Sequence, residues 1–153
     1  VREKIEARLV MVGNGSEFDS LRELAAALNL DQDVLFVGTQ ANPYAFVSRA
    51  DVVACSSLYE GFNRTLAEAL VLGKRVVSVD CPWGPAEILC GGKFGTLTAM
   101  GDEGAFAESL LSALETDLTE SERQRLMRRG EDFSVERTFA ALERAIQEVY
   151  EIR

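Results

Sequence analysis

The stretch DVVACSSLYEGFNRTLAEALVLGKRVVSVD, residues 51–80, carries the pattern that decides the fold. The apolar run at 51–56 is short and continuous, which is typical of a strand buried on both faces of a parallel sheet. A helix is expected over 63–72, because Gly73 follows as a C-terminal glycine cap. Another apolar run at 75–80 predicts a second strand. The order strand, helix, strand favours parallel strands joined by a right-handed crossover.

The same alternation continues on both sides of this repeat. Strands are expected at 7–13, 33–38 and 95–97, and helices at 16–30, 42–50, 86–89, 102–116, 119–130 and 134–151. Ser16 is expected to cap the first of these helices and Asn42 the second, with Pro43 in its first turn. The sequence therefore predicts an α/β fold built on a Rossmann-like, doubly wound parallel sheet.

The C-terminal helices raise two further expectations. The helix at 134–151 is amphipathic and is expected to pack on its own domain. The segment ERQRLMRR, residues 122–129, forms a basic helix face, for which solvation is favoured over a ligand-binding patch. Lys74 and Arg75 are likewise expected to be a solvated pair that complements the dipole of the preceding helix.

Composition restricts the chemistry that the chain can perform. It has 153 residues and a formal net charge of −9, which disfavours nonspecific binding to nucleic acid or anionic membranes. Histidine is absent, which excludes a Ser-His-Asp mechanism and a His-ligated metal site within this sequence. Cys55, Cys81 and Cys90 form no CxxC pair, and we expect reduced thiols. No apolar run in the sequence is long enough to span a bilayer.

Ligands of doubly wound sheets bind beyond the carboxyl ends of the strands, and the loop at 12–18 lies at such an end. Gly13 and Gly15 precede the expected helix there, so a ligand could approach the backbone closely. A plain tight turn explains the same two glycines, because the third glycine of a GxGxxG motif is missing and Phe18 occupies its place.

The segment LYEGFNRTLAEAL, residues 58–70, is more informative. A helix is expected to begin at Asn63 or Arg64, and its free N–H groups and positive dipole end favour an anion. Glu60 precedes the helix and Glu68 lies inside it, so at ~1.5 Å per helical residue they flank a site roughly 10 Å long. The alternative is a solvated Glu68. Its apolar neighbours argue against this, since an unpartnered buried carboxylate is costly.

This composite pattern resembles the signature of family-4 retaining glycosyltransferases of the GT-B fold, the group 1 glycosyl transferases. The resemblance covers about residues 7–115 and rests on Glu60 and Glu68, with Gly61-Phe62 after the first glutamate. Its supporting segments are ARLVMVGNG, VLFVGTQANPYAFVSRADVVACSS, GKRVVSVD and GPAEIL. The segment DCPWGPAEILCGGKFGTL is most similar to the bacterial branch that builds capsular, lipopolysaccharide or exopolysaccharide glycans.

The resemblance implies that the chain binds the donor, a nucleotide-diphosphate sugar. Glu60 would be the catalytic residue that contacts and orients the sugar. Backbone amides at Gly61, Phe62 and Asn63 would bind the diphosphate, and Glu68 would accept hydrogen bonds from the ribose.

The resemblance also implies parts for the glycine loops and for the chemistry. Backbone near Gly38 and Thr39 would meet the nucleobase, and Gly13 and Gly15 would line the cleft. Family members transfer sugar with retention, generally without a bound metal, and no cofactor is expected here. Cationic side chains and amides would stabilise the leaving phosphate instead.

Several residues near the motif admit two interpretations. Asn63 departs from the Gly, Pro or Ser usual after Gly-Phe, but it can cap the helix, so phosphate binding is expected to survive. Arg64 could reach the phosphate, although donation of its backbone N–H alone is favoured. Trp83 could stack on the sugar or plug the space between loops. Glu87 could act on the donor side or simply complement a helix dipole.

Compared with this family, the chain corresponds to one of two Rossmann-like domains. We expect residues 1–153 to be a single nucleotide-sugar-binding domain that lacks its first strand and the whole N-terminal acceptor domain. The isolated chain is then expected to be inactive or nearly so, and exposed strand edges would favour self-association. The resemblance implies a cytoplasmic protein and leaves open a peripheral position at the inner face of the membrane for a longer chain.

Two other functions remain open from the sequence. A non-catalytic nucleotide-binding or assembly module could share the fold, although the presence of both Glu60 and Glu68 argues against it. A nicotinamide-dependent oxidoreductase rests only on the GNG turn at 13–15 and lacks a convincing ribose-binding acid. The nucleobase, donor sugar, acceptor and linkage cannot be predicted.

Overall fold

The computed structural model of the chain describes residues 1–151, which fold as two compact units that divide between Ala50 and Asp51. Each unit contains its own parallel sheet. The predicted α/β alternation with parallel strands is confirmed. The parallel strands form a two-stranded sheet in the first unit and a three-stranded sheet in the second.

The first unit contains two strands and two helices, in the order β1 (Leu9–Val12), α1 (Phe18–Ala27), β2 (Val34–Gly38) and α2 (Tyr44–Val47). The strands β1 and β2 pair in parallel, with Leu9 opposite Val34. Helix α1 packs on this pair through Phe18, whose ring meets Phe36 of β2 edge-on at 5.6 Å between centroids. These elements place the loops after β1 and β2 at the same end of the small sheet.

Both caps predicted for this unit are wrong. Glu17, rather than Ser16, occupies the N-cap position of α1, and the Ser16 hydroxyl donates to the Glu17 carboxylate instead. Helix α2 begins after Pro43, so Asn42 lies one residue too early to cap it. In both cases the good capping residue is displaced by one position, which side-chain preference alone does not predict.

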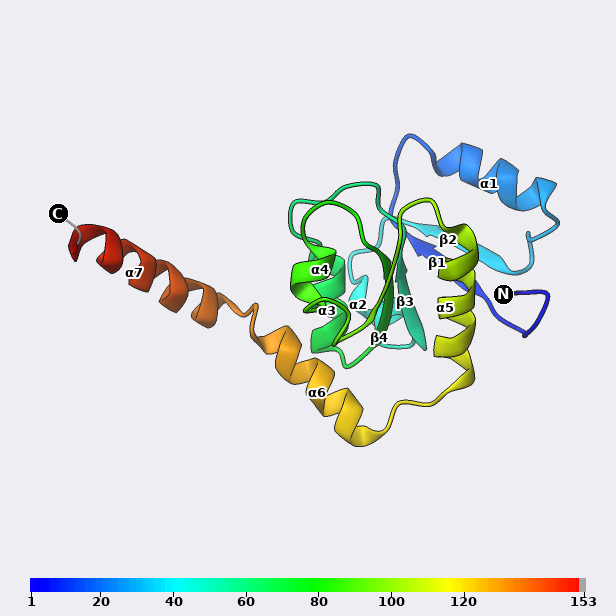
Figure 1. The fold of residues 1–153 in the computed structure, drawn as a ribbon. Helices are drawn as coiled ribbons and strands as arrows, with labels where there is room; N and C mark the ends of the chain where they lie inside the picture. Colours follow the sequence, from blue (N-terminus) through cyan, green and yellow to red (C-terminus); the bar gives the residue numbers. More distant parts are fainter. Residues whose placement is uncertain (152–153) are drawn as a thin grey trace. The chain divides into compact units, whose positions relative to one another are not determined.

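The second unit is centred on a three-stranded parallel sheet in the order β3 (Val52–Cys55), β4 (Arg75–Val79) and β5 (Thr96–Thr98). Helices α3 (Arg64–Val71) and α4 (Pro85–Ile88) lie on one face, and α5 (Glu103–Glu115) lies on the other (Figure 1). Strand β4 is central, and its Val76 and Val77 are fully buried. The core is completed by Leu66 and Leu70 of α3.

Gly73 ends helix α3 as predicted. Its φ of +63° is in the left-handed region that favours glycine. The N–H of Gly73 donates to the carbonyl of Leu70, and the N–H of Lys74 donates to the carbonyl of Ala69. This pair of bonds is a Schellman motif, and it turns the chain directly into β4.

Helix α6 (Glu120–Glu131) begins with a capping box formed by Thr119 and Glu122 and packs against α3. The prediction of a solvated basic face at 122–129 is wrong for Arg123 and Arg129, which are half-buried, whereas Arg125 is exposed. Arg123 donates to the carbonyl of Gly73, Arg125 to that of Lys93, and Arg129 to those of Glu87 and Ile88. These guanidinium groups bind loop and helix-end carbonyls of the same unit, which sequence spacing could not show.

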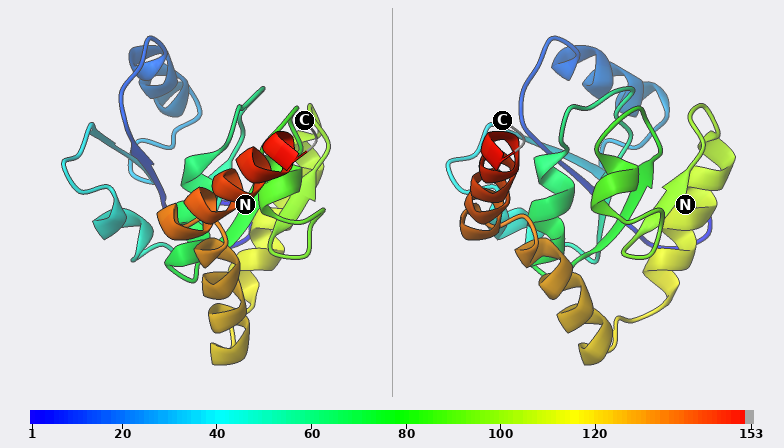
Figure 2. Two further views of the ribbon diagram at one scale, coloured as in Figure 1. Left: turned by 90° about the vertical axis from the view of Figure 1, so that its left-hand side faces the viewer. Right: turned by 60° about the vertical axis from the view of Figure 1, so that its left-hand side comes forward.

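Helix α7 (Val135–Glu151) follows α6 at the C-terminal end (Figure 2). Its apolar stripe is exposed, with Phe139 accessible over 61% and Leu142 over 53% of their surfaces. The prediction that this helix packs on its own domain is therefore wrong. The surface of α3 is already taken by α6, where Gly130 lies so close to Val71 that a Cβ would come within 2.5 Å of its nitrogen. No helix within residues 1–151 has the length and apolar content needed to cross a membrane.

Candidate functional site

The candidate site of the second unit is the N-terminal tip of α3, where the loop after β3 enters the helix. Arg64 is the first helical residue and Asn63 the N-cap, as expected. In the described part of the chain no backbone hydrogen bond uses the N–H groups of residues 61–63. Three unused donors therefore precede a helix whose dipole favours negative charge.

Asn63 is only 3% exposed, and its side chain makes three hydrogen bonds. Its Oδ1 accepts from the N–H of Leu66 at 3.2 Å, which is the capping bond. Its Nδ2 donates to Glu60 Oε1 at 2.8 Å and to Cys55 Sγ at 2.9 Å. The predicted capping role of Asn63 is confirmed, and the same amide also holds Glu60.

The Glu60 carboxylate receives a second bond, because the Ser57 hydroxyl donates to Oε1 at 2.7 Å. Both hydrogen bonds to this carboxylate within residues 1–151 end on the same oxygen. Glu60 is half-buried, so one oxygen is held by protein donors while the side chain still reaches solvent.

The loop after β4 packs against this tip through Gly84. A Cβ at Gly84 would lie 3.1 Å from the backbone nitrogen of Asn63 and 3.6 Å from Glu60 Cβ. Its φ of +85° is also one that other residues rarely adopt. The N–H of Glu60 donates to the carbonyl of Pro82 at 3.4 Å. The loops after β3 and β4 thus meet at the carboxyl end of the sheet, where ligands of this fold class bind.

Phe62 is held by an aromatic contact with the segment that follows α6. Its ring meets Phe133 edge-on at 5.3 Å, and the guanidinium of Arg129 lies 4.6 Å above the Phe133 ring. Aromatic pairs of this geometry contribute ~0.5–1.5 kcal/mol beyond burial. The Gly-Phe turn is therefore held from outside the loop.

The other predicted donor-binding residues of this unit lie nearby in the fold. Glu68 is half-buried, one helical turn after the exposed Arg64. Trp83 is exposed over 77% of its surface, so it does not plug the space between loops. Glu87 is exposed in the first turn of α4, and its carbonyl is bound by Arg129.

Burial raises the pKa of the Cys81 thiol, and the neighbouring Cys55 and Glu60 raise it further. Cys81 is buried just after β4, whereas Cys90 is exposed. All three cysteines are free thiols, as predicted. The raised pKa keeps Cys81 protonated near neutral pH.

In the first unit, the structure brings two of the predicted glycines together. The N–H of Gly13 donates to the carbonyl of Gly38 at 2.8 Å, and Thr39 follows directly. A hollow of about 270 Å³ borders Gly13 and Gly15 and is otherwise lined mainly by apolar side chains, among them Phe18 and Phe36.

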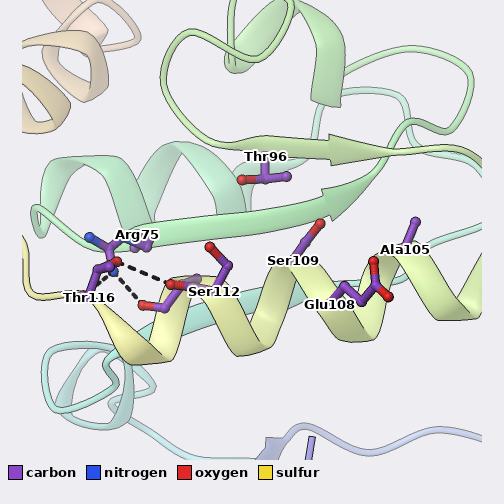
Figure 3. Close-up of a pocket in the computed structure, with 8 residues that line it drawn as sticks. Arg75, Thr96, Ala105, Glu108, Ser109, Ser112 and Thr116 are labelled. Atoms are coloured by element: carbon purple, nitrogen blue, oxygen red, sulfur yellow. Dashed lines mark hydrogen bonds between the residues drawn. The ribbon is translucent and has the colours of Figure 1, made fainter.

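A larger hollow of about 430 Å³ runs along α5 on the opposite face of the three-stranded sheet from α3 (Figure 3). Arg75 is the cation in its lining, and it donates to the carbonyls of Ala113 and Thr116 at the end of α5. The prediction that Arg75 is solvated is wrong for this reason. Because its guanidinium is engaged, this hollow is a poorer anion site than the α3 tip.

Sequence reasoning missed Ser57, Cys55 and Gly84. Ser57 and Cys55 precede Glu60 by three and five residues, and only the folded loop shows that they converge on the Asn63 amide and the Glu60 carboxylate. The sequence did indicate a special position at Gly84, since a glycine before Pro85 starts a short helix. The sequence did not indicate that Gly84 contacts the tip of α3.

Comparison with known proteins gives a consistent match. The family model of glycosyl transferases group 1 matches residues 1–133. The chain is 43% identical over 84 residues to an uncharacterized glycosyltransferase of Methanocaldococcus jannaschii, covering 55% of this chain and 21% of that protein. It is 34% identical over 116 residues to N-acetylgalactosamine-N,N'-diacetylbacillosaminyl-diphospho-undecaprenol 4-alpha-N-acetylgalactosaminyltransferase of Campylobacter jejuni, covering 76% of this chain and 32% of that protein.

A solved structure shows the same architecture. The apo form of the lipopolysaccharide outer core galactosyltransferase WaaB superposes with a TM-score of 0.81 at 25% identity, covering 92% of this chain and 40% of that one. The chain thus spans between a fifth and two fifths of the length of these three proteins. With the family model matched over residues 1–133, this chain belongs to the group 1 glycosyl transferases and shares the GT-B fold.

Proposed function

We propose that this chain is the part of a glycosyltransferase that binds the donor, a nucleotide-diphosphate sugar, at the tip of α3. The observation that carries the proposal is the tip itself. Within residues 1–151, three backbone N–H groups have no backbone partner, and they precede α3 beside a carboxylate that is held on one oxygen. A diphosphate needs donors and positive potential, and a sugar needs a rigid hydrogen-bond acceptor, so the two features together fit an activated sugar.

The proposed chemistry is transfer of the sugar with retention. The bond between the anomeric carbon and the diphosphate oxygen breaks, and negative charge grows on the leaving diphosphate. The N–H groups of Gly61, Phe62 and Asn63, which directly precede α3, would stabilise this charge together with the positive end of the helix dipole. One such donor is worth roughly 10²–10³ in rate in oxyanion sites of other enzymes.

The two glutamates have different parts in this proposal. Glu60 accepts hydrogen bonds from the donor sugar, and Glu68 accepts them from the ribose. Trp83 is exposed beside the tip-contacting Gly84 and is available to stack on the sugar. The expectation that no metal or other cofactor takes part stays a prediction.

The names of related proteins indicate the wider process. Two of the three relatives named above carry such names, one with a diphospho-undecaprenol carrier and one with the lipopolysaccharide outer core. We therefore place this chain in bacterial surface polysaccharide or lipopolysaccharide synthesis, on the cytoplasmic side where nucleotide sugars are made. Acceptor binding and turnover are assigned to parts of a longer protein.

A binding panel tests the proposal. The 153-residue chain is titrated calorimetrically with UDP, GDP, UDP-glucose, UDP-galactose, UDP-N-acetylglucosamine, GDP-mannose and NAD. We expect saturable binding of one nucleotide diphosphate and its sugar conjugates. Glu68→Ala should weaken both about tenfold, because a hydrogen bond to a charged group is lost, and Glu60→Ala should weaken only the sugar conjugates.

Glu108→Ala is the matched control, since it removes an exposed carboxylate beside the hollow along α5. Its affinities should equal those of the unaltered chain. Binding of NAD alone would contradict the proposal and favour an oxidoreductase. Binding of free nucleotides without any response to Glu60→Ala would favour the non-catalytic nucleotide-binding module.

A further inference from the structure

The Asn63 side chain uses both of its N–H donors and one of the two acceptor sites on Oδ1, and the bonds serve different roles. One oxygen caps α3, while the nitrogen spans from Cys55 at the end of β3 to Glu60 in the loop. Capping requires only the oxygen, which Ser, Thr or Asp would supply equally well. The two donated bonds are therefore not explained by capping.

The orientation of this amide is fixed by its partners. Reversing it would place Nδ2 against the Leu66 N–H and Oδ1 against the Glu60 carboxylate, so a donor would face a donor and an acceptor an acceptor. Because Asn63 is buried, neither mismatch could be relieved by water without cost. The amide thus has one stable state, and that state points N–H at Glu60.

Glu60 is constrained in turn. Its Oε1 already accepts from Asn63 and from Ser57, which uses both lone pairs of that oxygen. From this geometry we infer that Asn63 is a positioning residue, which locks Glu60 so that Oε2 alone is presented to the donor sugar. The inference rests on the proposed function, because it concerns how Glu60 meets its ligand.

A locked carboxylate has a consequence for specificity. With one oxygen occupied, Glu60 cannot rotate to accept from whichever hydroxyl is nearest. The entropy of ordering this side chain is spent during folding rather than on binding, which is the usual benefit of preorganisation. The donor sugar must then bring a hydroxyl to the position of Oε2.

Asn63→Ser tests the inference. Serine keeps the helix cap and adds no charge near the diphosphate, but it is too short to donate to Glu60. We expect affinity for the preferred sugar nucleotide of the panel to fall about tenfold and affinity for its free nucleotide to change by less than about threefold. Ser57→Ala should shift the same ratio in the same direction by a smaller factor.

Thr119→Ala is the control for a purely structural effect, since it removes a helix cap from α6 at a distance from the tip. It should lower stability and leave the ratio of the two affinities unchanged. An equal loss of both affinities in Asn63→Ser would overturn the inference, because it would show a cap and nothing more. Unchanged affinities for both the sugar nucleotide and the free nucleotide would overturn it too.

A second measurement needs no ligand. In a ¹⁵N-correlated NMR spectrum, the side-chain NH₂ pair of Asn63 is identified by its absence in Asn63→Ser. We expect Glu60→Ala to shift this pair and speed its exchange with water, whereas Glu108→Ala should leave it in place. If Glu60→Ala changes neither the chemical shift of the Asn63 NH₂ pair nor its exchange rate with water, the inference is overturned.

The two measurements separate the possible failures. Binding of none of the panel would contradict the proposed function, and the NMR comparison would then decide the Asn63–Glu60 contact by itself. If UDP or GDP binds but no sugar conjugate binds more tightly than its nucleotide, nucleotide binding stands and the positioning inference falls.

Discussion

At the scale of single residues, Gly84 is the position where the two site loops constrain each other most closely. Gly84→Ala should cost about 1–3 kcal/mol in the free energy of unfolding. The backbone conformation is unfavourable for alanine, and the added Cβ would lie only 3.1 Å from the backbone nitrogen of Asn63. Gly91→Ala is the matched control, since Gly91 also has positive φ but open space around it. Urea denaturation should show a larger loss for Gly84→Ala. Equal losses would mean that the contact with the tip contributes nothing.

Cys81 is a buried residue whose ionisation links pH to stability. Its pKa is raised in the folded chain, mainly by burial, whereas an unfolded cysteine ionises at about pH 8.5. The unfolded state therefore releases its proton first, so the stability due to this thiol is intact below about pH 8.5 and is lost as pH rises above it. Cys81→Ala should flatten the fall in unfolding free energy between about pH 8 and 10.

Cys90→Ala, at an exposed thiol, should leave that slope unchanged. The comparison uses slopes, because Cys81→Ala also removes buried volume. Identical slopes in the unaltered chain and Cys81→Ala would contradict the raised pKa.

At the scale of elements, α6 stabilises the C-terminal end of α4 through hydrogen bonds from Arg129. Arg129 donates to the carbonyls of Ile88 at 2.9 Å and Glu87 at 2.7 Å, and it pairs with Asp132 at 3.1 Å. Arg129→Lys keeps the charge but loses the planar set of donors. We expect a loss of about 1–3 kcal/mol in unfolding free energy, because the carbonyl of the buried Ile88 and that of the exposed Glu87 both lose a guanidinium donor.

Arg128→Lys is the control on the same helix, since Arg128 is exposed. It should change stability by less than about 0.5 kcal/mol. Equal stability of the two variants would show that the hydrogen bonds from Arg129 of α6 do not stabilise α4. The stripe of small and apolar contacts between α3 and α6, centred on Gly130, would then account for the packing.

At the scale of the whole molecule, the sequence predicted the order and type of the elements because the local periodicity of apolar residues indicates each one. The strand at 52–55, the Asn63 cap and the Gly73 stop are all visible within a window of a few residues. The contacts that failed prediction join distant positions. Arg129 reaches a carbonyl 42 residues away, and Arg75 one 38 residues away.

The same division holds for the site. A helix tip beside Glu60 could be predicted from spacing, but the convergence of Ser57 and Asn63 on one oxygen depends on the path of the loop. The apolar stripe of α7 led to the prediction that this helix is buried. An amphipathic pattern identifies the apolar face of a helix, but it does not identify the surface against which that face packs. Within residues 1–151 the position against α3 belongs to α6.

The most direct test of the central claim is to map where a nucleotide diphosphate binds. Backbone amide shifts of the 153-residue chain are followed by NMR during titration with UDP and with GDP. If the account is right, the largest shifts at saturation belong to the N–H groups of Gly61, Phe62 and Asn63, which donate to the diphosphate. Shifts centred instead on the hollow along α5, or no saturable shift with either nucleotide, would contradict it.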